Sequence, residues 1–384
     1  MPTPPLSDED LDISVATYVR CNYSTSEAAS VLGLSPRAMR HRLKTAREKG
    51  KMVPSGVIQE PPPLGFSVKG TSTLVGGDGE IKAQWVKTEA DKEQREEQFR
   101  AFAEELADIV KGKVKPTKEP KSTEADLLTV YPMGDPHIGM YAWADEAGED
   151  FDLDIAERDL TAAMARLVQS APKSETALIL NLGDFFHADN MENRTMRSGN
   201  VLDVDTRWQK VLQVGARAFY TLVQSALKKH RDVVIRNVIG NHDDHSAVFL
   251  SLLLDAYYRN EPRVTVELSP SAVWYMRFGK VLIGATHGDK AKWKDLAKIM
   301  AVDRPDDWGQ SVYRYWHTGH VHHDRVQEDM GVVMECHRTL AAKDAWHAAQ
   351  GYRSGRAMKC IVYDREYGEV ERHTADIRRV RDGS

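Results

Sequence analysis

The stretch ALILNLGDFFH, residues 177–187, carries the strongest structural signal in this sequence. Its apolar part has the length and composition of one buried strand, and Gly183, Asp184 and His187 follow at once. From about residue 125 onward, short apolar runs of this kind alternate with helical segments. The other runs are LLTVY, VVIRNVI, VTVEL, VLIGAT and VYRYWHT. This layout predicts a mixed α/β domain over residues 125–384, with its ligands on loops at strand ends.

Polar motifs follow several of these runs in a fixed order. They are GDPH (134–137), GDFFH (183–187), GNHD (240–243), THGD (286–289) and GHVH (319–322). Aspartate, asparagine and histidine are suitable ligands for a pair of metal ions that share one carboxylate. Asp135 and His137 are two positions apart, so in an extended segment both would face one side and reach one ion. The same argument applies to His320 and His322.

Together the motifs resemble those of the calcineurin-like metallophosphoesterase superfamily over about residues 127–323, in the pattern D-x-H, GD, GNHD, H-G and GHxH. The resemblance implies a double β-sandwich flanked by helices. It further implies a first metal site made by Asp135, His137 and His322 and a second made by Asn241, His287 and His320. Asp184 would bridge the two ions. Mn²⁺ is the expected metal, and Fe or Zn²⁺ also suits these ligands.

The resemblance also implies roles beyond metal ligation. His242 would lie beside the scissile phosphate as general acid or electrostatic stabiliser, while a hydroxide activated by the two ions attacks phosphorus. Asp243 would orient either His242 or a ligand, and the sequence leaves this choice open. His187 would help to position the phosphate, with a buried supporting histidine as the alternative.

The second motif bears on the substrate. It reads GDFFHADN and lacks the DRG of serine/threonine protein phosphatases, but it resembles the GDLFH motif of DNA break-repair nucleases. We therefore expect a nuclease that hydrolyses DNA phosphodiesters, with exo or endo action left open. One alternative is a phosphodiesterase or phosphatase on a small nucleotide, and another is a DNA-binding regulator with a silent phosphoesterase domain. Such nucleases commonly dimerise and pair with an ATPase, and both kinds of partner stay open here.

Residues 1–52 predict a small helical DNA-binding domain. Ser24 and Glu27 form a capping-box pattern, Gly33 ends that helix, and Ser35-Pro36 begins the next one. Two helices joined by a tight turn predict a helix-turn-helix, whose second helix enters the major groove. Its expected DNA contacts are Arg37, Arg40, Arg42, Lys44 and Arg47. The alternative is a protein-interaction module with a solvated basic face. A similar pairing of modules occurs in phage proteins.

Residues 53–124 are expected to link the two domains. They comprise a proline-rich stretch (53–64), a β-hairpin around GGDG (65–87), a charged helix (88–111) and a basic linker (112–123).

Bulk composition restricts the remaining possibilities. The net charge of −5 excludes a general polyanion binder, so any DNA contact needs a local basic patch. Three widely spaced cysteines exclude a disulfide framework. A signal peptide and an apolar run of about 18 residues are both missing from the sequence, so a cytoplasmic location without a membrane partner is expected.

Other histidines and lysines near the motifs are given structural roles. His323 is expected to point away from the metals, and His317 is expected to be packed. His245 lies near the phosphate or caps a helix, and the sequence leaves this open. The lysines after His287, at 290, 292 and 294, are expected to begin a helix with a solvated face, and the alternative is that they and Trp293 guide a nucleic-acid strand by charge and stacking.

Overall fold

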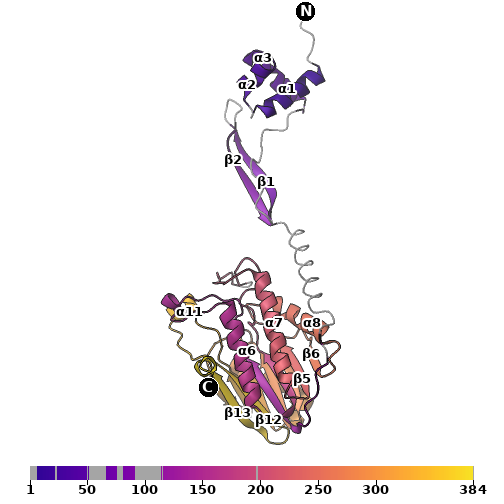
Figure 1. The fold of residues 1–384 in the computed structure, drawn as a ribbon, viewed down its shortest axis with the longest axis vertical. Coiled ribbons are helices and arrows are strands. Elements are labelled where there is room, and N and C mark those ends of the chain that lie inside the picture. The colour runs from indigo at the N-terminus through magenta and orange to yellow at the C-terminus, as the bar shows by residue number, and fades with distance from the viewer. Residues whose placement is uncertain are drawn as a thin grey trace, which may run out of the picture. The chain divides into compact units, whose positions relative to one another are not determined.

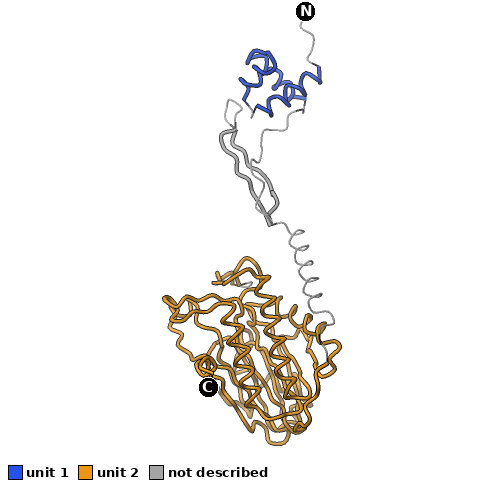
Figure 2. The backbone as a smooth tube through the Cα atoms, viewed as in Figure 1, with its two compact units in different colours: residues 1–101 blue, residues 102–384 orange. Residues whose placement is uncertain are grey.

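The computed structural model describes residues 7–21, 24–49, 51, 66–75, 81–90, 114, 116–195 and 198–383. For Arg47 and for the strands at 66–75 and 81–90 it describes the backbone only. The chain divides into two compact units, Met1–Ala101 and Phe102–Ser384 (Figure 2).

Three helices with a common core make up the described part of the first unit before the hairpin. They are α1 (Asp8–Arg20), α2 (Thr25–Val31) and α3 (Pro36–Glu48). The predicted caps are present: Ser24 Oγ accepts the Glu27 N–H, and Ser35 Oγ accepts the Ala38 N–H at 3.1 Å. The core residues are Leu11, Ala28, Ala29, Met39, Leu43 and Ala46.

Antiparallel strands β1 (Phe66–Val75) and β2 (Ile81–Ala90) occupy the stretch for which a hairpin was predicted. Because β2 continues to Ala90, the charged helix expected over 88–111 is wrong for residues 88–90. Residues 91–111 of that expectation lie outside the described residues.

Two sheets form the centre of the second unit. The first has the order β13-β12-β3-β4-β5-β6, and the second has the order β10-β11-β9-β8-β7. The first sheet consists of β3 (Glu124–Met133), β4 (Ser174–Asn181), β5 (Asp232–Asn237), β6 (Val264–Glu267), β12 (Ala357–Asp364) and β13 (Gly368–Asp376). The second consists of β7 (Val273–Phe278), β8 (Val281–Thr286), β9 (Tyr313–Thr318), β10 (Arg325–Asp329) and β11 (Val332–Cys336). Each apolar run singled out in the sequence lies wholly or mainly on a strand, which confirms the predicted mixed α/β fold.

The sheets face each other across a shared apolar layer. Leu178 and Leu180 of β4 meet Ile283 of β8 in this layer, whereas Ala177 and Ile179 of β4 point to the helical side. Alternate side chains of one strand therefore enter two different cores, so these strands read as continuous apolar runs.

Helices cover the outer faces of both sheets. Figure 1 shows α6 (Leu153–Ser170) and α7 (Trp208–Leu227) lying across the first sheet, with α8 (Ser246–Tyr258) nearby. On the second sheet, α9 (Trp293–Asp303) packs Leu296 and Met300 against Trp316. The predicted sandwich flanked by helices is confirmed. Four short helices complete the unit: α5 (Ala144–Ala147), α10 (Pro305–Gln310), α11 (Ala345–Ala349) and α12 (Ile377–Arg381). Among the described helices, none combines the length and apolarity that crossing a bilayer requires.

Candidate metal centre

The histidine and aspartate motifs lie beyond the ends of five strands. Within the first sheet β3, β4 and β5 are parallel, and within the second β8 and β9 are parallel. Parallel strands deliver their carboxyl ends to one edge of a sheet, where ligands bind in open α/β structures. The motifs follow β3, β4, β5, β8 and β9, so side chains far apart in the sequence meet at this edge.

The first group of donor atoms comes from Asp135, His137 and His322, whose ligand atoms all lie within 4.8 Å of one another. His137 Nε2 and His322 Nε2 are 3.1 Å apart, and His322 Nε2 is 3.6 Å from Asp135 Oδ1. This is the set expected for the first ion. His322 is the only one of the three that is not fully buried.

The second group comes from Asp184, His287 and His320. His287 Nε2 lies 3.3 Å from Asp184 Oδ2 and 3.0 Å from Asn241 Oδ1, so the asparagine joins the group. His287 Nδ1 donates to the Leu182 carbonyl at 2.8 Å, which turns Nε2 toward the carboxylate.

His320 and His322 fall in different groups, so the argument that an extended backbone turns both toward one ion is wrong. Their φ angles are 72° and 56°, and both residues are therefore left-handed rather than extended. Asp135 and His137 do share a group, but they also have left-handed backbones, with φ of 47° at each.

Left-handed backbone is concentrated at the donor residues. Asp184 also has a positive φ, of 50°, so five of the non-glycine residues in this conformation belong to the two donor groups. Such a backbone costs an L-residue on the order of 1 kcal/mol and persists where the surroundings impose it. The strained backbone at these residues and the convergence of their donor atoms both fit a site that holds cations.

Two glycines allow the carboxylates to lie against the backbone. A Cβ at Gly240 would collide with Asp184 Oδ1, and a Cβ at Gly319 would lie 2.6 Å from Asp135 Oδ2. The Asp135 carboxylate also accepts the His320 N–H at 2.8 Å. The glycines are therefore required by close approach, and the loops hold the carboxylates firmly.

Asp243 is fully buried and holds the Asp184 loop. It accepts the N–H groups of Phe185 at 2.8 Å, of Gly240 at 3.0 Å, of Asp184 at 3.2 Å and of Phe186 at 3.3 Å. It thereby ties the second motif to the third and orients a candidate ligand, and its carboxylate makes no hydrogen bond to the His242 ring among the described contacts.

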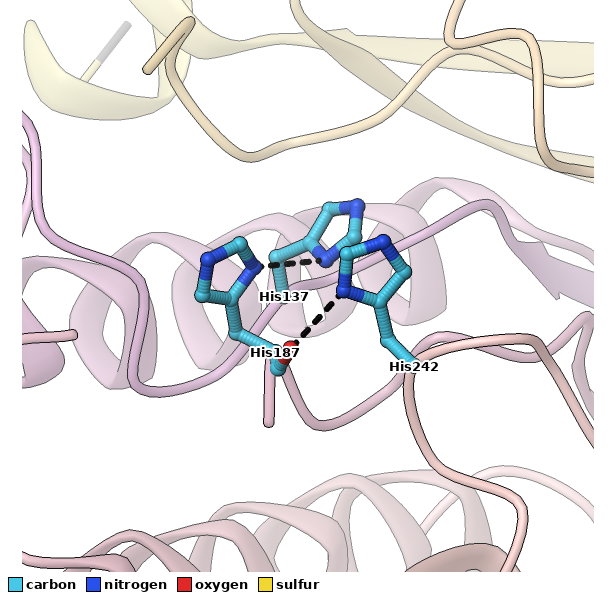
Figure 3. Close-up of side chains that lie close together, drawn as sticks. All are labelled: His137, His187 and His242. Carbon is cyan, nitrogen blue, oxygen red and sulfur yellow. Dashed lines mark hydrogen bonds between the residues drawn. The ribbon is translucent and has the colours of Figure 1, made fainter. Parts of the chain in front are cut away.

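The rings of His137, His187 and His242 lie close together (Figure 3), and His137 also belongs to the first donor group. His242 Nδ1 donates to the His187 carbonyl at 2.8 Å, which leaves Nε2 free to face the site. His187 Nδ1 lies 3.2 Å from His137 Nδ1, and His187 Nε2 is buried with no hydrogen-bond partner among the described residues. His187 thus supports the ring of a candidate ligand.

Burial and the nearby carboxylates shift the pKa values of the histidines at the site. Burial, with His242 and His322 nearby, holds the pKa of His137 well below its usual value. Burial likewise lowers the pKa of His187 to about 3, so both rings are neutral with lone pairs available. Burial opposes protonation of His287, yet the Asp184 and Asp135 carboxylates raise its pKa to about 10. Burial and the Asp184 charge raise the pKa of Asp243, whereas the backbone N–H groups of Gly240 and Phe186 that donate to it act in the opposite direction.

The remaining histidines have structural contacts. His317 is buried between His337 and Tyr363, as expected. His323 is exposed, and its ring bonds the Val321 carbonyl. His245 is the N-cap residue of α8, and its Nδ1 pairs with buried Asp189 at 2.7 Å.

Two residues near the site, His347 and Asp344, carried no recognised signal in the sequence. His347 stacks on His322 with ring centroids 4.9 Å apart, and its Nδ1 pairs with Asp344 at 2.6 Å. Neither residue follows an apolar run, although aspartate is a common N-cap residue and Asp344 is the N-cap of α11.

The segment with three lysines after His287, residues 290–294, begins a helix as expected. Lys292 is the N-cap of α9, and Arg325 lies over the ring of Trp293.

The basic residues of α3 differ in exposure. Arg37, Arg40 and Lys44 are exposed. Arg42 is half-buried, lies 3.7 Å from Asp10 and bonds Ser14, so its expected place on the exposed face is wrong. The side chain of Arg47 lies outside the described residues.

Neither a protein-family model nor a curated protein matches this sequence. Solved structures align with it at low identity. An archaeal phosphodiesterase aligns at 12% identity over 65% of this chain and 99% of that chain, with a TM-score of 0.33. The E. coli phosphoesterase YfcE aligns at 13% identity over 64% and 98%, with a TM-score of 0.33. Vps29 of Entamoeba histolytica, complexed with Zn²⁺, aligns at 14% identity over 65% and 99%, with a TM-score of 0.28.

Proposed function

We propose that this protein is a metal-dependent phosphoesterase with two divalent cations in its site. The observation that carries the proposal is the presence of two donor groups at one edge of the sheets, each with a buried carboxylate and neutral or carboxylate-paired imidazoles. Asp184 borders both groups, because its Oδ2 lies 3.3 Å from His287 Nε2 and its backbone carbonyl accepts the His137 N–H at 3.0 Å. Asp135, His137 and His322 would hold one cation, and Asn241, His287 and His320 the other, with Asp184 between them.

The chemistry divides between the cations and the protein. When bound, two divalent cations polarise phosphoryl oxygens and lower the pKa of a coordinated water. His242 presents Nε2 to the substrate, because Nδ1 donates to the His187 carbonyl. A proton on Nε2 would pass to the leaving alkoxide oxygen. Asp243 keeps the Asp184 loop in place, and His187 fixes the ring of His137.

We further propose that the substrate is a nucleic acid, with DNA as the first choice and Mn²⁺ as the first metal to test. Arg37 and Arg40 are exposed on α3 and would contact DNA phosphates, which raises the local concentration of a DNA substrate. The histidine that ends the GDFFH motif distinguishes this site from that of protein phosphatases.

Hydrolysis assays on the full chain test the proposal. Purified protein with Mn²⁺ is incubated with labelled single- and double-stranded DNA and with bis(p-nitrophenyl) phosphate. We expect turnover that Asp184→Asn and His242→Ala remove, while Asp145→Asn and His373→Ala, which change exposed or surface groups, retain it. Turnover of the chromogenic diester without turnover of DNA would point to a small nucleotide substrate. Binding of DNA without turnover of any ester would leave a DNA-binding regulator.

A further inference from the structure

A cavity of about 120 Å³ lies beside the first donor group. Its lining includes His322, Lys343, His347, Tyr352, Arg353 and Ser354. Pockets that enclose a whole drug-sized ligand measure roughly 300–1,000 Å³, so this one suits a smaller group such as a phosphate with part of a sugar. Because His322 belongs both to the cavity and to the candidate metal site, a group in the cavity would lie next to a phosphate held at that site.

The cavity carries a net positive charge. Arg356 in its wall is paired with Glu149, which also lines it, so those two charges cancel. Lys343 makes no ion pair with any residue that the structure describes. Arg353 donates to the backbone carbonyls of Ala348 and Tyr352 and so keeps its charge uncompensated by a carboxylate. Two cations without acidic partners favour an anionic ligand.

Aromatic side chains stand beside these cations. Trp346 is 58% exposed, and its ring lies 6.0 Å from that of Tyr352, which is also exposed. The His347 ring touches both of them and stacks on His322. Exposed aromatic rings next to basic groups are the usual surface for stacking nucleic-acid bases.

We propose that this cavity binds the nucleotide that flanks the scissile phosphodiester, with its phosphate on Lys343 and Arg353 and its base on Trp346 and Tyr352. This inference rests on the proposed function. His347, held by Asp344, is a positioning residue that keeps His322 and the aromatic surface in register. We therefore expect the site to prefer a nucleic-acid strand to a phosphodiester that has no flanking nucleotide.

Chromogenic diesters with and without a second phosphate test the phosphate contact. The substrates are p-nitrophenyl thymidine 5′-phosphate, its 3′-phosphorylated form, and the isomeric pair with the two positions exchanged, so that both strand directions are covered. We expect the second phosphate to raise kcat/KM about tenfold in one isomer, chiefly through KM, as one charged contact provides. Lys343→Met with Arg353→Met should abolish this preference, so that the singly and doubly phosphorylated esters have the same kcat/KM within about twofold.

A matched control variant distinguishes binding at this cavity from a general effect of the protein's positive charge. Arg259→Met with Lys298→Met removes the same charge from exposed helix positions and should keep the preference. Arg259 lies at the far end of α8 from His245, about 20 Å away along a helix of this length. A preference that survives in the Lys343/Arg353 variant, or that is absent from the wild-type protein in both isomers, would overturn the proposal.

Binding without turnover gives an independent readout. Titration calorimetry with thymidine 3′,5′-bisphosphate in EDTA should show about tenfold weaker binding by the Lys343/Arg353 variant. Trp346→Ala with Tyr352→Ala should weaken binding of the nucleotide but not of inorganic phosphate. Equal affinity of both variants and wild type would overturn the cavity assignment. Nucleotide binding that depends on Lys343 and Arg353, with no ester hydrolysed under any metal, would sustain the cavity and refute the proposed function.

Discussion

The Nε2 atoms of His137 and His322 face each other at 3.1 Å although 185 positions separate the two residues in the chain. Burial and neighbouring imidazoles hold the pKa of His137 low, so this ring offers a lone pair rather than a second proton. Two imidazole nitrogens that meet beside a buried carboxylate form a cation site more naturally than a hydrogen-bonded pair. The relationship connects the loop after β3 to the loop after β9, and thus one sheet to the other.

Metal binding should therefore stabilise the fold. At a free Mn²⁺ concentration 100 times its Kd, the free energy of unfolding should rise by about 2.7 kcal/mol, because only the folded chain presents the assembled donors. Chemical denaturation with and without Mn²⁺ measures this increase. His137→Ala should remove most of it, whereas His373→Ala on β13 should not. An increase of the same size in both variants would place the ion elsewhere.

Asp243→Asn should weaken both the fold and the metal site. The carboxylate accepts four backbone N–H groups, and an amide NH₂ would face some of these donors. Each unsatisfied buried donor costs about 1–3 kcal/mol, so we expect a loss of about 3 kcal/mol in unfolding free energy. Calorimetric titration should show Mn²⁺ affinity reduced at least about tenfold, since Asp184 loses its support. Asp145→Asn serves as the exposed control, and unchanged affinity in Asp243→Asn would show that the loop holds its shape alone.

Glu335→Gln should destabilise the second sheet without touching the metal donors. Glu335 is buried and accepts Lys359 Nζ at 2.9 Å and both terminal nitrogens of Arg372 at 2.7 and 2.9 Å. Removal of one partner of a buried ion pair leaves charge unmatched, and we expect a cost of about 3 kcal/mol by urea denaturation. Glu371→Gln, at a more exposed position, should cost well under 1 kcal/mol by the same measurement. Equal effects would mean that the buried network adds little.

His230 should make stability depend on pH. Its Nε2 meets Tyr131 Oη at 2.8 Å and its Nδ1 lies 3.1 Å from the Ser174 carbonyl, and burial lowers its pKa to about 4. Between pH 6.5 and 4 the unfolded chain binds a proton that the folded chain does not. The free energy of unfolding is therefore not reduced by His230 above about pH 6.5. As the pH falls to 4, protonation of His230 in the unfolded chain lowers the free energy of unfolding by about 3 kcal/mol.

The measurement is the slope of unfolding free energy against pH. Tyr131→Phe with His230→Leu should make that slope shallower by about 1.4 kcal/mol per pH unit in this window. The slope of the variant is subtracted from that of the wild type, because burial also lowers the pKa of other histidines such as His317, which therefore contribute to both slopes. Identical slopes for variant and wild type would contradict a neutral His230.

Charge reversal on α3 should separate DNA contact from folding. Arg37→Glu with Arg40→Glu should reduce DNA affinity and flatten its dependence on salt, because exposed cations release counterions from phosphates. Arg42→Glu should instead destabilise the three-helix core, because Arg42 lies against Asp10 and Ser14. Filter binding over a salt series and thermal unfolding measure the two effects. DNA binding that is insensitive to Arg37 and Arg40 would remove the DNA-contacting role of α3.

The sequence predicted the strands well because both faces of the central sheets are buried. Each strand then appears as an unbroken apolar run, and a polar motif marks the strand end. The same reasoning failed for His320 and His322, because period-two alternation holds only for extended backbone and these residues are left-handed. It also failed for Arg42. Helix periodicity predicts which face of α3 carries Arg42, but it does not predict that Asp10 of α1 lies against this side chain.

By itself the sequence determined which segments are strands, where the polar loops begin and which residue types can ligate metals, because these follow from local periodicity and side-chain chemistry. Only the tertiary structure decided that Asp243 holds the Asp184 loop and that His347 lies on His322. Those relationships depend on the crossing of two sheets and on strained loops, where segments distant in the chain meet. Local sequence patterns do not predict contacts between residues that are so far apart in the chain.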